Sequence, residues 1–404
     1  MPLPGRLLSA NRPGADQHAA PGACREGLEG GARGNPPRAA DAHARFVSRQ
    51  PALSALPGGQ APDPFPAPGH GAARCGASLP GTDRGSAQDE EFGSVNPELS
   101  VIIPVLNWDL GLLLDRLTTE IDGAGLAETV EIIVVDDCSR EEIRRRNRAA
   151  ACRHAMVVYH ELPDRAGRAG IRNHLLARAR GRYILFLDAD VLPDSAFFLR
   201  NYLQEARAGH PVICGGISYR TRILTGRCYD FSLYRGRKTE WLPVEQRRQT
   251  PWRYLFTGNV LLDRHVLEQV GFDESFSGYG YEDIEWAIRL ARLVPIRHID
   301  NTCSHLGLVD KRSAFARMRR STENYLRLAR LHPGEFSQTP VFRLFRMLRP
   351  WPRPLLGALD RVLAGLFVIS PLQDLSYLLF QLDKAVLLAV LDREWRQEPE
   401  GGRS

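Results

Sequence analysis

The middle of the chain alternates between two patterns of hydrophobic positions. Four short runs are continuously apolar and rich in β-branched residues, which is typical of strands buried on both faces of a sheet. Between them lie stretches with apolar residues at helical spacing. The predicted strands cover residues 99–106, 131–137, 155–161 and 183–190, and the predicted helices cover 110–121, 140–151 and 171–181. Strands alternating with helices predict an α/β fold with a doubly wound, mainly parallel sheet.

The second half of the chain is less regular. Its predicted elements are a strand at 211–219, a strand and helix at 258–270, a helix at 281–293, a strand at 296–302 and a basic helix at 311–331. The Arg-rich segment 221–249 shows no clear period, and we expect it to be a long mobile loop.

The two ends of the chain differ from the middle. Residues 1–96 are rich in Pro, Gly, Ala and Arg and have no hydrophobic period, so they cannot bury enough apolar surface to offset the entropy cost of ordering. We expect a disordered tail, or a segment absent from the native protein if translation starts downstream. Residues 97–333 form the predicted α/β domain, and residues 334–404 form a predicted helical segment.

The C-terminal segment is apolar over residues 354–395. Asp374, Asp383 and Lys384 interrupt every window long enough to span a membrane. Two interpretations follow from this pattern. The segment is either an interfacial helical pair that binds a membrane surface or a partner, or it is a pair of helices packed on the α/β domain or at a dimer interface.

Composition narrows the range of partners. The 404 residues include 53 basic and 47 acidic side chains, giving a net charge of +6. This mild excess suits a surface that meets phosphates or anionic lipid head groups, and the chain has no RNA- or DNA-binding motif, so we expect no nucleic acid partner. The seven cysteines are odd in number and include no C-x-x-C pair, which argues against a disulfide framework or a zinc site. The start of the chain lacks a secretory signal, so we expect a cytoplasmic location.

Acidic residues follow two of the predicted strands. Asp136 and Asp137 end one strand, and Asp188 and Asp190 end another. Ligands of open α/β sheets bind beyond the carboxyl ends of the strands, so these acids lie where the fold predicts a site. The pair at 188 and 190 suits Mg²⁺ or Mn²⁺, and the pair at 136 and 137 suits a nucleoside. For the pair at 188 and 190 the alternative is a solvated acidic turn with Asp194 capping the next helix, and for the pair at 136 and 137 it is helix capping by Asp137 or Ser139.

A second acidic pair, Glu282 and Asp283, begins a predicted helix. Gly278 and Gly280 precede it and permit a tight turn. A positioned carboxylate at this point is a candidate general base for an acceptor hydroxyl. The alternative is that the pair only complements the helix dipole.

Two further residues are candidates for binding. His305 follows a predicted strand and is a candidate metal ligand, whereas His298, inside the strand pattern, is a weaker one. Arg172 lies near a helix start behind Gly167 and Gly170, where a cation beside backbone N–H groups suits a diphosphate. A structural histidine and a surface arginine are the alternatives.

The order of these motifs resembles that of glycosyltransferase family 2. The segments IIPVLN, VVDDCS, GIRN, FLDAD, TGNVLLDR and GFDE-x-F-x-GYGYEDIEWAIRL follow one another between about Leu99 and His332. The last is similar to a motif of bacterial chondroitin-type polymerases and of galactosyl- and N-acetylgalactosaminyltransferases. The resemblance implies a GT-A fold, which is a Rossmann-like mixed sheet with helices on both faces. It also implies transfer of a sugar, with inversion, from a nucleotide-sugar donor, expected to be a UDP-sugar.

The resemblance implies roles for matching residues on the donor side. Pro104 and Asp136 would line the nucleoside pocket with help from Asp137. Arg172 would lie near the donor phosphates or ribose, and Asp188 would also contact the donor.

It implies further roles around the metal and the sugar. Asp188 and Asp190 would form the D-x-D element that holds Mn²⁺ or Mg²⁺, with Asp190 the more direct ligand and His305 completing the shell. Gly258 and Asn259 would line the sugar and acceptor site.

The acidic pair would carry the catalysis. Asp283 would be the base, and Glu282 would contact the acceptor or donor sugar. The chain departs from many relatives by having Tyr281 where they have glycine, so the donor sugar is not carried over. We also expect the loop at 221–249 to close over the donor. The acceptor would be a carbohydrate or a lipid-linked sugar.

Two other functions fit parts of the pattern. A sugar nucleotidyltransferase needs a Gly-rich, basic loop after the first strand, where this chain has PVLNWDLG. A non-catalytic module that binds nucleotide-sugars or carbohydrates needs no acidic pair at 282 and 283.

Overall fold

The computed structural model describes residues 96–276, 278–337 and 339–397. Apart from Asn96, the tail predicted for residues 1–96 lies outside these ranges.

A mixed seven-stranded sheet forms the centre of the α/β domain. Its strand order is β3-β2-β1-β4-β8-β6-β9. The first four are mutually parallel, and β8 runs antiparallel to both of its neighbours. The strands are β1 (Leu99–Val105), β2 (Val130–Asp136), β3 (Val157–Glu161), β4 (Tyr183–Leu187), β6 (Val212–Cys214), β8 (Asn259–Asp263) and β9 (Ile296–His298). The predicted α/β class and mixed sheet are confirmed.

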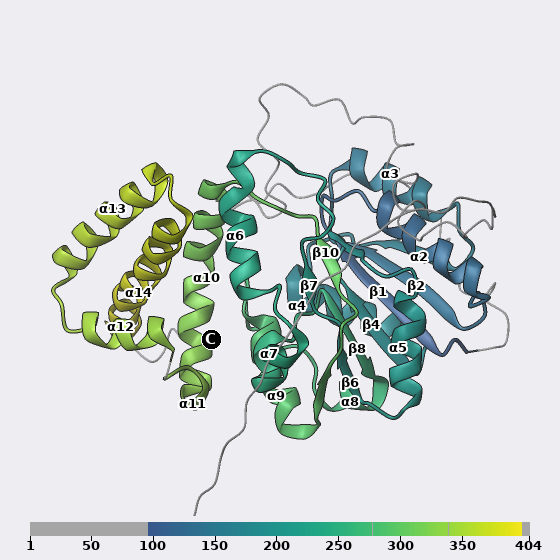
Figure 1. The fold of residues 1–404 in the computed structure, drawn as a ribbon. Helices are drawn as coiled ribbons and strands as arrows, with labels where there is room; N and C mark the ends of the chain where they lie inside the picture. The colour runs from purple at the N-terminus through teal and green to yellow at the C-terminus, as the bar shows by residue number, and fades with distance from the viewer. Residues whose placement is uncertain (1–95, 277, 338, 398–404) are drawn as a thin grey trace, which may run out of the picture. The chain divides into compact units, whose positions relative to one another are not determined.

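Helices cover both faces of this sheet, which explains why its strands are apolar throughout. Val101 and Ile103 pack in one core while Ile102 packs in the other, because successive side chains of a strand point to opposite faces. The first core includes α2 (Gly111–Ala124), α3 (Glu141–Ala151) and α5 (Phe198–Arg207). The second includes α4 (Gly167–Arg178), α8 (Arg264–Gln269) and α9 (Glu282–Leu293), as Figure 1 shows.

A small second sheet joins distant parts of the chain. It has the order β5-β10-β7 and consists of β5 (Val191–Pro193), β7 (Ile217–Ser218) and β10 (Cys303–His305). In the antiparallel β5–β10 ladder His305 pairs with Val191, and the amide of Leu306 donates to the Asp190 carbonyl at 2.7 Å. This ladder therefore brings His305 to the D-x-D segment across more than a hundred residues.

The C-terminal helices form a third core beside the domain. Helix α14 packs against α10, α12, α13 and α6, so that α6 and α10 lie between it and the sheet (Figure 1). These helices are α6 (Asp230–Thr239), α10 (Lys311–Leu331), α12 (Pro340–Leu348), α13 (Arg353–Ile369) and α14 (Gln373–Gln397). Shorter elements are α7 (Val244–Gln249), α11 (Pro333–Phe336), η1 (Arg227–Tyr229) and η2 (Pro251–Tyr254). Within the described ranges, none of the helices has the length and apolar character needed to cross a membrane.

The charged residues that interrupt the C-terminal segment fix its packing. Arg319 of α10 forms ion pairs with Asp360 of α13 at 2.7 Å and with the fully buried Asp383 of α14 at 3.1 Å. Helix α14 therefore packs against the α/β domain through α10. Helix α13 buries one side against α14 and leaves large apolar residues exposed on the other.

The prediction of a long loop at 221–249 is wrong over most of that segment. It contains η1, α6 and α7. The reason is that its polar side chains bind buried groups instead of water. Arg247 is 1% exposed and donates hydrogen bonds to the carbonyls of Leu242, Cys214, Gly215 and Ile299. Contacts of this kind leave no periodic pattern of hydrophobic residues, so the sequence did not indicate helices here.

Candidate active site

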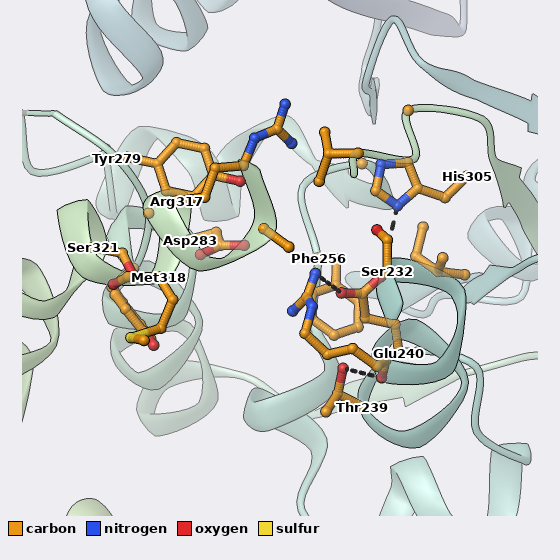
Figure 2. A pocket seen from close by; sticks show the side chains of 18 of the residues that line it. Ser232, Thr239, Glu240, Phe256, Tyr279, Asp283, His305, Arg317, Met318 and Ser321 are labelled. Atoms are coloured by element: carbon orange, nitrogen blue, oxygen red, sulfur yellow. Dashed lines mark hydrogen bonds and ion pairs between the residues drawn. The ribbon is translucent and has the colours of Figure 1, made fainter. Parts of the chain in front are cut away.

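Two adjoining cavities open at the carboxyl edge of the parallel strands. The larger, of about 390 Å³, lies between the sheet, α6, α9, α10 and α14. Figure 2 shows lining residues from three of these helices, Ser232 of α6, Asp283 of α9 and Met318 of α10. The smaller, of about 170 Å³, lies between β1 and α4. Asp188, Asp190 and His305 line both cavities. Binding pockets of small molecules typically have a few hundred Å³ and a few convergent polar groups, and the pair meets that description.

The pairing of β4 with β8 brings Asp188 next to the backbone of Gly258. β4 ends at Leu187, which pairs with Asn259 of the antiparallel strand β8, so Gly258 lies beside Asp188. The amide of Asp188 donates to the Gly258 carbonyl at 3.4 Å. A Cβ at position 258 would lie 2.9 Å from an Asp188 carboxylate oxygen, so any larger residue would displace the Asp188 side chain.

The smaller cavity holds three of the four residues predicted to surround the nucleoside and phosphates. Pro104, Asp137 and Arg172 line it. Asp136 is fully buried, and its carboxylate accepts hydrogen bonds from the Ser139 amide at 2.6 Å and the Tyr159 hydroxyl at 3.0 Å. Burial raises the pKa of Asp136, and these hydrogen bonds oppose the rise. Asp136 therefore fixes the loop that carries Asp137.

Two arginines and two carboxylates form a chain across the site. Arg172 donates to Glu282 at 3.1 Å and to Asp188 at 3.3 Å, and Arg168 donates to Glu282 at 2.8 Å. Arg172 and Glu282 are almost fully buried. Burial alone would raise the pKa of Glu282, but the two guanidinium groups outweigh it and lower that pKa. Glu282 thus stays ionised and holds both arginines in place.

Asp283 is in a different electrostatic state from its neighbour. Its carboxylate lines the larger cavity and forms no ion pair among the described residues; one oxygen accepts from the Ile284 amide at 2.9 Å. Burial, followed by the negative charge of Glu282, raises the pKa of Asp283 to about 7. The two adjacent carboxylates therefore differ as an acid–base pair requires: one is held ionised by cations, and the other takes or gives a proton near neutral pH.

The turn before this pair has an uncommon backbone conformation. Gly278 and Gly280 have φ of 80° and 83°, and Tyr281 has φ of 75°. This left-handed region suits glycine and costs a bulky residue about 1–2 kcal/mol. Tyr281 nevertheless adopts this conformation, at the position where the resemblance led us to expect glycine in many relatives. Its ring packs against Tyr325, with centroids 5.2 Å apart, and forms part of the cavity wall.

His305 lies between two carboxylates. Its Nε2 is 3.3 Å from Asp190, and its Nδ1 is 3.7 Å from Glu240 of the chain following α6. Burial by itself would lower the pKa of His305, but Asp190 and Glu240 raise it to about 10. Figure 2 shows His305 and Glu240 on the side of the cavity opposite Asp283.

Asp190 and His305 suit a divalent cation. A carboxylate oxygen and an imidazole nitrogen are both common ligands of Mn²⁺. The two acids beside His305 also favour positive charge at this place, whether a proton on the imidazole or a metal ion carries it. Asp188 faces Arg172 instead of completing a triad. Among residues 96–276, 278–337 and 339–397, no three His, Cys, Asp or Glu side chains converge closely enough to hold a metal by themselves.

Gly307 makes room for Asp190. A Cβ there would lie 2.1 Å from the Asp190 carboxylate oxygen that faces His305. If Asp190 and His305 hold Mn²⁺, Gly307→Ala should rotate Asp190 away from His305 and weaken the binding of Mn²⁺ about 10- to 100-fold, as loss of a positioning contact does. A manganese titration of activity measures this. Gly271→Ala, whose Cβ would meet nothing within 4 Å, is the control. Equal manganese dependence of both variants would contradict the assignment.

Some predicted residues lie apart from the cavities. The Asn259 side chain is buried and bonded to Tyr202, Gly216 and Asn301, so it supports the edge of the sheet. His298, the weaker histidine candidate, is fully buried and accepts from Arg247.

Other cavity residues were missed by the sequence analysis. They include Arg168, Arg235, Glu240 and Lys384. Arg168 stands four residues before Arg172, and this spacing on a helix was a usable signal for a shared face. The other three come from the segment predicted as a loop and from the C-terminal helices, and no pattern linked them to the acidic motifs.

Comparison with known proteins finds one family match and one curated relative. Residues 100–271 match Glycosyl transferase family 2. The chain is 29% identical to validoxylamine A glucosyltransferase of Streptomyces hygroscopicus subsp. limoneus, over 48% of this chain and 48% of that protein. It therefore spans about half the length of this curated relative.

Solved structures of similar proteins are more distant. The mannosyltransferase PcManGT from Pyrobaculum calidifontis, in complex with GDP-Man and Mn²⁺, is 18% identical, with a TM-score of 0.46 over 76% of this chain and 89% of that one. Residues 1–349 of S. aureus TarS are 16% identical, with a TM-score of 0.39 over 74% of this chain and 92% of that one.

Proposed function

Because residues 100–271 are a glycosyl transferase family 2 domain, we propose that this protein transfers a sugar from a nucleotide-sugar donor to an acceptor hydroxyl. The observation that carries the proposal is the contrast between Glu282, which two arginines hold ionised, and Asp283, which faces the larger cavity with its pKa raised to about 7. That contrast supplies a base where an acceptor would enter and cations where a diphosphate would leave.

The donor would lie across both cavities. Its nucleoside would enter the smaller one, beside Pro104 and Asp137, and its diphosphate would lie at the junction near Arg168 and Arg172. We favour a UDP-sugar donor, as the resemblance to glycosyltransferase family 2 implies. Asp190 and His305 would hold Mn²⁺ or Mg²⁺, which, when bound, stabilises negative charge on the departing diphosphate. The fixed guanidinium groups would add to that stabilisation without reorganising.

Asp283 would remove the proton of the acceptor hydroxyl as the oxygen attacks the anomeric carbon. A direct attack opposite the leaving diphosphate inverts the configuration at that carbon. The test is proton NMR of the transferred sugar with an α-linked UDP-sugar donor. A β-linked first product supports the mechanism, and an α-linked first product would rule out a single displacement.

The pH profile gives a second test. The base works only as the carboxylate, and the pKa of Asp283 is raised to about 7, so we expect kcat/KM to rise about tenfold per pH unit below pH 7 and to level off above it. Glu282→Gln removes the neighbouring negative charge that helps raise the pKa of Asp283. The acidic limb of this variant's pH profile should therefore lie at lower pH than that of the wild type. An acidic limb at the same pH in both proteins would contradict the assignment of the base.

We also propose that the C-terminal helices place the enzyme on an anionic membrane surface. Large apolar residues are exposed along one face of α13 and the start of α14. They are Leu355, Val362, Leu366, Ile369, Leu372, Leu375 and Leu378. Arginines are exposed in the same C-terminal segment at positions 343, 346, 353 and 361, and their positive charge suits anionic lipid head groups.

Flotation with liposomes tests the membrane proposal. Wild-type protein should float with vesicles of phosphatidylglycerol and phosphatidylcholine, and Leu366→Glu/Ile369→Glu should lose most of this binding because each charge would enter the apolar layer. Phe197→Glu, which changes an exposed aromatic residue at the start of α5, is the control. Equal flotation of all three proteins would contradict the proposal.

A further inference from the structure

The wall of the larger cavity opposite the sheet comes from the C-terminal helix. Phe380, Gln381 and Lys384 of α14 line the same cavity as Asp283. The acceptor side of the site is therefore completed by a segment outside the matched residues 100–271.

Lys384 is a buried cation without a carboxylate partner among the described residues. It is 9% exposed, and its ammonium group donates to the Tyr281 hydroxyl. The ammonium nitrogen also lies 3.9 Å from the centre of the Tyr325 ring and 4.9 Å from that of Tyr281. These contacts orient the lysine, but neutral rings and a hydroxyl leave its charge uncompensated.

The surrounding charges make this position more positive. Arg235 lines the same cavity and lies 3.4 Å from its partner Glu240. The positive charges of Arg235 and Arg253 both repel that of Lys384. Burial, and then these two arginines, lower the pKa of Lys384 to about 8, against the opposing effect of Tyr325. A desolvated cation beside other cations costs free energy unless an anion joins them.

Lysine is rare in this chain, so a buried lysine in the cavity wall is an uncommon feature. Of its 53 basic residues only three are lysines, at 238, 311 and 384. Lys311 also ties α10 to the C-terminal helices, donating to the Ser370 carbonyl at 2.6 Å and to Ser376 at 2.8 Å. It does so with ordinary hydrogen bonds and without lining the cavity. Joining these helices thus does not require a cation in the cavity wall.

We propose that Lys384, with Arg235, binds an oxyanion of the acceptor, a phosphate ester or a carboxylate, and so selects acidic acceptors. The inference rests on the proposed transferase function and specifies its acceptor. Tyr281 takes part by holding the ammonium group toward the cavity. Its strained backbone conformation at a position that suits glycine fits this use, because such strain concentrates at functional sites.

The three lysines permit a direct test by NMR. Reductive methylation with ¹³C-formaldehyde labels each ammonium group, and single Lys→Arg variants assign the signals. With UDP and diamagnetic Mg²⁺ saturating the donor site, methyl phosphate and acetate are titrated separately at constant ionic strength. We expect a saturable shift of the Lys384 signal with one of these anions and none of the Lys311 signal. The more effective anion identifies the acceptor group.

Calorimetry of the same anion completes the test. Lys384→Met should weaken its binding about 10- to 100-fold, the loss typical of a charge-assisted hydrogen bond, while Lys311→Met should bind as wild type does. If UDP raises the melting temperature but neither anion shifts Lys384, the inference is wrong and the donor site stands. If UDP does not bind either, the proposed function fails as well.

Discussion

Asp283→Asn should reduce sugar transfer by about 10²- to 10⁴-fold, the contribution of a positioned general base. Asparagine keeps the size of the side chain and can still accept from the Ile284 amide, but it cannot take a proton from the acceptor. Donor affinity should change little because the proposed donor contacts lie with the arginines and with Asp190 and His305. The measurement is kcat for transfer, together with the dissociation constant of UDP.

The control for this prediction is Glu323→Gln. It removes an acidic charge from an exposed position of α10 and should leave both quantities unchanged. A transfer rate for Asp283→Asn within threefold of wild type would exclude Asp283 as the base. Loss of UDP binding together with loss of rate would instead make Asp283 part of the donor site.

Arg172→Met should lower the free energy of unfolding by about 3–5 kcal/mol, the usual loss when one partner of a buried ion pair is removed. Arg172 is 2% exposed and lies between Glu282 and Asp188. Methionine leaves Glu282 buried with Arg168 as its single partner and leaves Asp188 without its cation. Urea unfolding measures the loss, and donor binding should fall with it.

An exposed ion pair serves as the control that distinguishes the effect of burial on stability from the effect of losing a charge. Arg182 pairs with Asp263 at 3.4 Å but is 67% exposed, so Arg182→Met should cost about 1 kcal/mol or less. The double variant Arg172→Met/Glu282→Gln should recover part of the stability, because it removes the unpaired carboxylate together with its partner. A loss below about 1 kcal/mol for Arg172→Met would mean that the chain of ion pairs does not hold the site together.

Local patterns predicted the elements that carry the acids. The continuous run at 99–106 is apolar because Val101 and Ile102 enter different cores. The helix predicted at 311–331 occupies α10, where Asp310 caps its first turn by accepting from the amides of Arg312 and Ser313. Because parallel strands end at one edge, the position of Asp188 and Asp190 after β4 followed from chain order alone.

Long-range contacts explain what the patterns did not predict. Arg247 lies in a stretch without a hydrophobic period, yet its guanidinium group donates hydrogen bonds to carbonyls of two other segments, at 214–215 and at 299. Lys384 lies in an apolar helix, a hundred residues from the Tyr281 hydroxyl it binds. The groups that Arg247 and Lys384 bind lie far from them in the sequence and produce no local pattern, so these contacts could be found only in the folded structure.

The most direct test of the central claim is release of nucleoside diphosphate from a panel of UDP- and GDP-sugars, with carbohydrate acceptors and with Mn²⁺ or EDTA. We predict release from one donor, dependent on Mn²⁺ and lost in Asp283→Asn. Binding of a donor without turnover under every acceptor condition would contradict the account and would indicate a module that binds nucleotide-sugars without catalysis.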